Sequence, residues 1–148
     1  MSSEVRSLVV TGLIRLAGSP DYRDRADAGR ALAIFAEMPE ASRTLMSLLL
    51  DASDTFVTRV TAEALLRRLD RTGLAVVATG LAAADSNCAD WIHTAVVDVF
   101  GMSNRELGAA MQECQVLTQS PDERVRRGAR VLLAMLGEIS SVSRPQGI

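Results

Sequence analysis

A repeat of 33 or 34 residues runs through the sequence and constrains its fold more than any other feature. Four blocks of ten residues align: DRADAGRALA from 24, VTRVTAEALL from 57, WIHTAVVDVF from 91 and VRRGARVLLA from 125. If the first residue of each block is position zero, positions four and eight hold Ala28, Thr61, Ala95 and Ala129, and Leu32, Leu65, Val99 and Leu133. A period of this size is typical of solenoids, in which each unit buries its apolar face against its neighbours. The repeat therefore predicts a stack of similar units.

Turn signals divide each unit into two helices. Ser19 before Pro20 is a helix-start signal, and Ser120 with Glu123 has the pattern of a capping box. We expect outer helices at 3–17, 40–50, 72–84 and 103–118, and inner helices at 20–37, 54–70, 87–100 and 121–137. This pattern predicts an all-α fold with about eight helices, arranged as a right-handed α-solenoid of four two-helix repeats. The single domain, 1–138, has expected units at 3–38, 39–71, 72–101 and 102–138, and a disordered tail is expected at 139–148.

The four blocks resemble HEAT repeats, in particular the short HEAT-like repeats of phycobilisome lyases, whose pattern is a capped start followed by V-R-x-x-A-x-x-A-L. The matches are Arg25, Ala28, Ala31 and Leu32 in the first unit, Val57, Ala64 and Leu65 in the second, and Val125, Arg126, Ala129 and Leu133 in the fourth. The third unit departs most, because Trp91 and Ile92 replace Val-Arg and Asp98 stands where Ala is usual. Trp91, at position zero, is expected in the core. The resemblance covers nearly all of 3–137 and implies a helical repeat fold, but the family hosts scaffolds, enzyme accessories and some nucleic-acid enzymes, so it implies no single function.

Composition narrows the classes of function. Hydrophobic residues make up 48% of the chain but only five residues are aromatic, so the core must consist of Ala, Leu and Val. The net charge is −2 and all sixteen basic residues are Arg, which fits a GC-rich genome; a dedicated nucleic-acid-binding protein usually has a basic excess. The longest apolar stretch, 74–84, is about half the length of a membrane span, and no basic region of a signal peptide precedes the first apolar segment. We therefore expect a soluble, cytoplasmic protein with no membrane segment.

Residues with catalytic or metal-binding spacing do not occur in the sequence. Cys88 and Cys114 lie far apart, and His93 is the only histidine. Cys88 and His93 would be about 140° apart on one helix and so would not face each other. We therefore expect no enzyme activity, no metal and no cofactor. Arg25 and Arg126 occupy the consensus Arg position, where we expect pairing with a carboxylate between repeats in preference to phosphate binding.

One face of the inner helices is the candidate binding surface. At 100° per residue, positions two, six and nine point away from the core. Apolar residues stand among charged ones on this face, which is typical of a protein interface. The alternative is that Leu66 and Phe100 tuck under the next unit. The predicted binding residues are Arg59, Leu66, His93, Val97, Phe100, Arg127 and Val131, with Phe100 and Arg127 as the main contacts.

These features favour a non-catalytic protein–protein interaction module, which would be a scaffold, an adaptor or an inhibitor-type binding protein such as an immunity protein. The expected partner is another protein, and a homodimer is a second option. The alternative function is that of a nucleic-acid-associated HEAT-like protein that uses the Arg clusters of the second and fourth repeats. These clusters are Arg67, Arg68 and Arg71, and Arg124, Arg126, Arg127 and Arg130. Acids interrupt both clusters, so nucleic acid is the less favoured partner.

Overall fold

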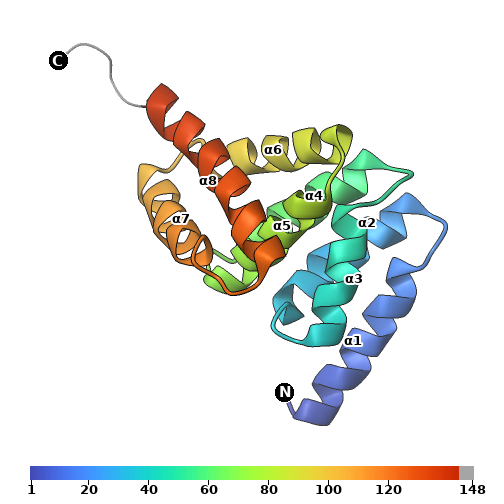
Figure 1. Cartoon of the computed structure of the whole chain (residues 1–148). Coiled ribbons are helices and arrows are strands. Elements are labelled where there is room, and N and C mark those ends of the chain that lie inside the picture. The colour runs from blue at the N-terminus through green and yellow to red at the C-terminus, as the bar shows by residue number, and fades with distance from the viewer. Residues whose placement is uncertain (144–148) are drawn as a thin grey trace.

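Helices make up almost the whole of the computed structural model, which describes residues 1–143 (Figure 1). The α-helices are α1 (Ser3–Ala17), α2 (Tyr22–Leu32), α3 (Pro39–Leu49), α4 (Thr55–Leu66), α5 (Arg71–Ala83), α6 (Ser86–Phe100), α7 (Asn104–Leu117) and α8 (Glu123–Ser143). A short 3-10 helix, η1 (Ala33–Phe35), follows α2. No β-strand occurs within residues 1–143. The prediction of an all-α fold with about eight helices is confirmed.

Aspartates at the helix starts explain where the chain breaks into helices. Five of them accept a hydrogen bond from a backbone N–H in the first turn of the helix that follows: Asp21, Asp54, Asp70, Asp85 and Asp122. The predicted caps, Ser19 and Ser120, lie two residues before Asp21 and Asp122. Their hydroxyl oxygens accept hydrogen bonds from the backbone N–H groups of these two aspartates. Each serine therefore tightens the turn and the aspartate after the proline caps the helix, so α2 and α8 each begin two residues later than predicted.

The first six helices pack largely in chain order. The even-numbered helices α2, α4 and α6 lie side by side, while α1, α3, α5 and α7 contact one another in sequence. Between them lies an aliphatic core, whose fully buried members include Leu32, Leu45, Leu65, Leu74 and Leu132. The near absence of aromatic side chains from this core fits the small separation that Ala and Leu allow between helices.

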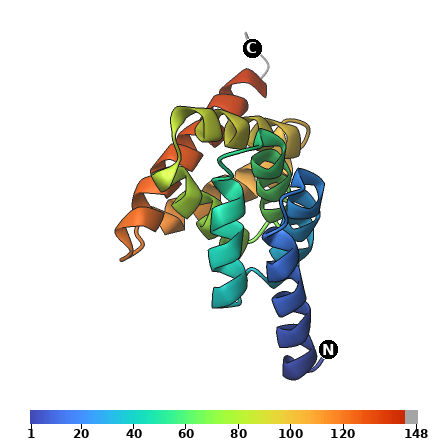
Figure 2. The ribbon, with the colours of Figure 1, turned by 90° about the vertical axis from the view of Figure 1, so that its right-hand side faces the viewer.

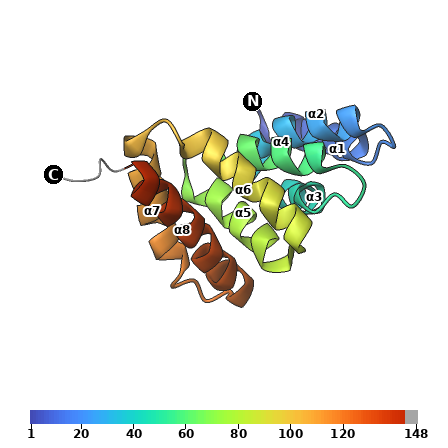
Figure 3. The ribbon, with the colours of Figure 1, turned by 90° about the horizontal axis from the view of Figure 1, so that it is seen from above.

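The last helix departs from this order. The most extensive contact of α8 is with α5, and its contact with α6 is much smaller (Figure 3). Gly128 permits the close approach, because a Cβ at this position would overlap the carbonyl oxygen of Ala78 in α5. On its other side, α8 is therefore left only loosely packed against α6.

The end of α8 also differs from the prediction. The helix continues to Ser143, whereas the sequence predicts a disordered tail from residue 139 onward. Ile139 is buried against the core, and this burial stabilises the additional helical turn. The rest of the predicted tail, 144–148, lies outside the described residues. Within residues 1–143, no helix has the length and apolarity needed to cross a membrane.

Candidate binding groove between α6 and α8

The residues predicted for the binding face do not form one surface. Leu66 and Phe100 have only 0% and 1% of their area exposed, so they belong to the core and cannot contact a partner. Their assignment to the binding face is therefore wrong, and the alternative, that they pack under a neighbouring unit, fits their burial. The other predicted residues reach the surface, but at different places.

Position nine of the repeat shows why the helical wheel failed. This position is buried in the first three units, at Ala33, Leu66 and Phe100, and exposed in the fourth, at Ala134. A helix such as α4 contacts α2, α3, α5 and α6, so its buried side is wider than the single stripe that a wheel assumes. Helix α8 buries a different side from the other inner helices, because it packs closely against α5 at Gly128.

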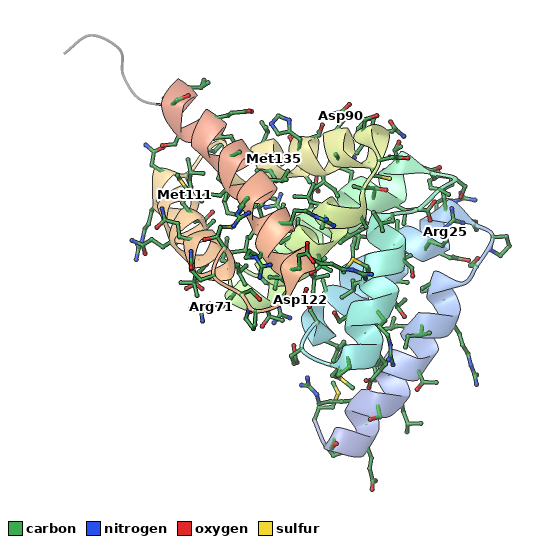
Figure 4. The ribbon with its side chains drawn as sticks, viewed as in Figure 1. Arg25, Arg71, Asp90, Met111, Asp122 and Met135 are labelled. Carbon is green, nitrogen blue, oxygen red and sulfur yellow. The ribbon has the colours of Figure 1, made fainter. Side chains whose placement is uncertain are left out.

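A groove between α6 and α8 brings together three of the predicted residues. Two adjoining hollows of about 580 and 290 Å³ share His93 of α6 and Glu138 of α8. Val97 and Val131 line the groove and are 43% and 41% exposed. Met135, on the α8 side, adds a flexible apolar wall (Figure 4). The lining is therefore apolar yet open to solvent.

Charged residues stand along this apolar lining. The His93 Nε2 atom lies 3.5 Å from Glu138 Oε2, which makes an ion pair when the imidazole is protonated. Asp90 of α6, labelled in Figure 4, lines the same hollow about one turn from His93, and Arg130 of α8 lines it about two turns from Glu138. The α6 wall runs from Ala89 to Gly101, which corresponds to roughly 18 Å of helix. The groove is therefore long enough for about three turns of a bound helix.

Several groove residues were missed in the sequence analysis. Glu138 and Val142 were missed because α8 was expected to end at 137. Asp90 and Arg130 were missed because only positions two, six and nine were taken as exposed. The usable signal was the apolar spacing of Leu132, Leu136 and Ile139, which continues the helical period past the expected end.

Arg59, another predicted site residue, lies away from the groove on the contact between α4 and α6. Its Nη1 atom is 3.0 Å from Glu63 Oε1 and 3.8 Å from Asp98 Oδ2. The guanidinium also lies over the ring of Phe56, 5.6 Å from its centroid. Arg59 is therefore engaged within the chain. Trp91 of α6 is 37% exposed, so its expected place in the core is wrong.

Arg127, the last predicted site residue, belongs to the basic first half of α8. It is exposed and donates a hydrogen bond to the carbonyl oxygen of Ala82 at 3.3 Å. Arg124 and Arg130 are also exposed, and none of the three makes an ion pair with the described residues. The exposed side of α8 thus begins basic and continues apolar into the groove.

The Arg cluster of the second unit is, by contrast, largely neutralised. Arg68 lies 2.9 Å from Asp70 and 3.4 Å from Glu37, and its Nη1 atom also donates to the carbonyl oxygen of Ala33. Arg71 lies 2.7 Å from Glu113 of α7. These contacts neutralise Arg68 and Arg71, so Arg67 is the one member of the cluster without an ion pair among the described residues.

Arg25 forms the contact between repeats that the sequence predicts. Its Nε donates to Asp51 Oδ2 at 2.8 Å, and its Nη1 donates to the carbonyl oxygens of Ser19 and Pro20 at 3.0 Å. Burial raises the pKa of Asp51, but the hydrogen bonds from Arg25 and nearby backbone amides outweigh it, so the pKa lies below its usual value. Arg126 makes only the corresponding backbone contact, to the carbonyl oxygen of Ser120 at 2.9 Å, and has no carboxylate partner within residues 1–143.

Nucleophilic and metal-binding groups do not gather in the groove. Cys88 and Cys114 are both buried free thiols, and burial raises the pKa of Cys114 to about 12. Burial also raises the pKa of Cys88. Neither thiol is therefore in the reactive thiolate form near neutral pH. In the described part of the chain, no three His, Cys, Asp or Glu residues gather in a way that could hold a metal ion.

Comparison with known proteins adds little to this picture. No protein-family model matches the sequence, and no curated protein matches it. A crystal structure described as that of an engineered protein aligns with 91% of this chain at 24% sequence identity and a TM-score of 0.38. The chain spans 65% of the length of that protein. A likeness at this level shows neither a shared fold nor a shared function.

Proposed function

We propose that the protein is a non-catalytic protein-binding module that holds an apolar segment of a partner protein in the groove between α6 and α8. The observation that carries the proposal is the pair of solvent-exposed valines, Val97 and Val131, which line the two adjoining hollows of one groove with charged residues around them. An apolar centre with a polar rim is the usual anatomy of a recognition surface. Scaffold, adaptor and inhibitor-type roles all use such a surface.

An amphipathic helix is the partner segment that fits these features best. The two walls are stretches of helix about three turns long, so residues of a bound helix spaced three and four apart would contact the apolar lining. His93 and Glu138 lie midway, where they would meet polar residues on the sides of the bound helix. Arg130 at one end suits an acidic residue.

We also infer that the four helix pairs form a right-handed solenoid of the HEAT-like type. Support comes from the 33- and 34-residue spacing and from the ordered contacts of α1, α3, α5 and α7 and of α2, α4 and α6. The position of α8 on α5 is the exception, and it affects the fourth pair alone.

The direct test is peptide selection followed by substitution in the groove. Helical peptides selected against the wild-type protein should bind it, and the Val97→Glu, Val131→Glu double variant should weaken that binding about tenfold or more, measured by fluorescence anisotropy. Val116→Glu is the matched control, because Val116 is a comparably exposed valine on α7 outside the groove. Peptides that bind the double variant as tightly as wild type would place the binding surface elsewhere.

Nucleic-acid association is a second candidate, because Arg124, Arg127 and Arg130 are exposed and unpaired within the described residues. The neutralised cluster of the second unit makes it the weaker candidate. Affinity for a fluorescent DNA duplex, measured across salt concentrations, separates the two functions. Phosphate contacts predict a steep loss of affinity with salt that an Arg127→Glu, Arg130→Glu variant abolishes, whereas the protein-binding module should show no appreciable affinity for DNA.

A further inference from the structure

The outer face of α1 is apolar and is not covered by any of residues 1–143. The N-terminal half of this helix projects beyond the other helices (Figures 1 and 2). Leu8 is 72% exposed and Val5 46%, and Val9 is also exposed, whereas Val10 on the opposite side is buried. Single exposed aliphatic residues are ordinary, but a row of them on one helix face marks a contact surface.

The geometry of this face suits the approach of a second helix. Val5, Leu8, Val9 and Gly12 fall within an arc of about 100°. Gly12 has no neighbouring atom within 4 Å of the place where a Cβ would stand, so the packing of this chain does not require a glycine there. Since glycine carries no side chain, this position leaves space beside Leu8 into which a neighbouring helix can fit.

Two charged residues beside the apolar face are complementary to each other. Glu4 and Arg15 lie on the same flank of α1, eleven residues or about three turns apart. Neither makes an ion pair with any residue of the described chain. Each is therefore available to an outside partner, and the two have opposite charges at opposite ends of the helix.

We propose that two copies of the chain associate through α1, with the helices antiparallel about a two-fold axis that crosses the apolar face at the level of Val9. This axis places Glu4 of each copy opposite Arg15 of the other, which forms two equivalent ion pairs. It also places Leu8 of each copy near Gly12 of the other, where the missing side chain leaves space. In a parallel pair, Glu4 of one copy and Arg15 of the other would stay about three turns apart and could not meet, so the charge pattern selects the antiparallel arrangement.

The expected dimer is a weak one. A pair of single helix faces buries less than the roughly 1,200 Å² at which stable interfaces begin, so monomer and dimer should exchange at micromolar concentrations. This association uses the opposite end of the helical array from the groove between α6 and α8 and is independent of the function proposed for that groove (Figure 1).

Sedimentation equilibrium of the full chain, between about 5 and 500 μM, tests the proposal. The wild type should shift from monomer to dimer over this range, and Leu8→Glu should abolish the shift. Val116→Glu, which changes a comparably apolar exposed site on α7, should leave the shift unchanged. Circular dichroism should show the same helix content for all three proteins, because neither substituted residue is buried.

Charge reversal identifies the antiparallel pairing. Glu4→Arg alone and Arg15→Glu alone should each weaken dimerisation at low salt several-fold, because each creates two like-charged contacts. The double variant Glu4→Arg, Arg15→Glu should restore the wild-type dissociation constant. An equimolar mixture of the two single variants should also dimerise, since every contact then joins opposite charges.

Three results would overturn the proposal. The first is a wild-type protein that stays monomeric throughout the concentration range. The second is a dimer that survives Leu8→Glu, which would place the contact elsewhere. The third is a dimer that requires Leu8 but responds equally to the single and double charge variants, since this would exclude the antiparallel pairing. Binding of a monomeric wild type to anionic vesicles would show that a lipid surface covers the face instead.

Discussion

The contact between α2 and α4 and the contact between α6 and α8 hold corresponding places in the repeat but are built differently. At the first, Gly29 lies directly against Thr61, and Arg25 joins the turn before α2 to Asp51 in the next unit. At the last, α8 leans on α5, and its contact with α6 is small. The first contact is closed, and the last leaves the groove.

The difference teaches that a repeat in sequence does not produce identical interfaces. Both contacts use a glycine to bring two helices close, but Gly29 faces the next even-numbered helix whereas Gly128 faces α5. Where the glycine stands on the helix decides which neighbour is approached most closely. Because α8 packs closely against α5 and not against α6, a groove stays open between α6 and α8. The residues that line it are those that close packing of α8 on α6 would bury.

Phe100 and Val131 give the largest expected contrast, because the sequence predicts the same exposed face for both. Phe100→Ala should lower the free energy of unfolding by about 3–5 kcal/mol, since it empties a fully buried site. Val131→Ala should change it by no more than about 0.5 kcal/mol, because Val131 lies at the open groove. Urea denaturation monitored by circular dichroism measures both, and similar values for the two variants would contradict the burial described here.

Gly128 and Gly137 test whether close packing on α5 positions α8. Gly128→Ala should destabilise the protein by about 2–3 kcal/mol, because the added methyl group meets the backbone of Ala78. Gly137→Ala, on the same helix, should stabilise it by about 0.5–1 kcal/mol, because that site is open and alanine favours the helix. Thermal unfolding gives both values. Stabilisation by both substitutions would show that α8 is not held against α5.

The sequence predicts the helices well because their determinants are local. The spacing of apolar residues depends only on residues close together in the chain, and so do turns such as the one containing Pro20. The structure confirms an all-helical fold with eight α-helices within residues 1–143. The Arg25 contact was also predictable, since a consensus position between repeats recurs at a known distance. The differences are in the bounds: α2 and α4 end at Leu32 and Leu66, before the predicted 37 and 70, and α8 continues past 137, where the burial of Ile139 stabilises it.

The binding surface was less predictable because it depends on contacts between distant segments. The burial of Phe100 reflects the several helices that contact α6, and the exposure of Val131 reflects how α8 meets α5; a helical wheel contains neither. Gly128 was visible in the sequence, but its role requires knowing that Ala78 lies opposite. Three of the seven predicted residues line the groove for this reason: His93, Val97 and Val131.

Arg25 and Arg126 provide a smaller contrast at the same repeat position. Arg25→Met should cost about 2–3 kcal/mol of unfolding free energy, because it leaves the largely buried carboxylate of Asp51 without its partner. Arg126→Met should cost less than about 1 kcal/mol, since within the described residues Arg126 loses only a backbone contact. Urea denaturation near neutral pH checks the pair. Equal losses would mean that Arg126 has a partner of comparable strength.

The pH dependence of stability gives the smallest and most specific contrast. Burial raises the pKa of Asp51, but the stronger effect of Arg25 and the amide hydrogen bonds lowers it below the value of about 3.9 expected in the unfolded chain. A carboxyl group with a lowered folded pKa binds protons less readily in the folded state, so its contribution to stability is complete above about pH 4 and is lost as the pH falls through the folded pKa.

Between about pH 5 and pH 2.5, wild type should therefore lose about 1 kcal/mol more unfolding free energy than Asp51→Asn, which cannot titrate at this position. Arg126→Met should keep the acid sensitivity of wild type, because no carboxylate of the described chain pairs with Arg126. Denaturation curves at a series of pH values measure the difference, and an Asp51→Asn profile parallel to that of wild type would show that the closed contact does not depend on an ionised Asp51.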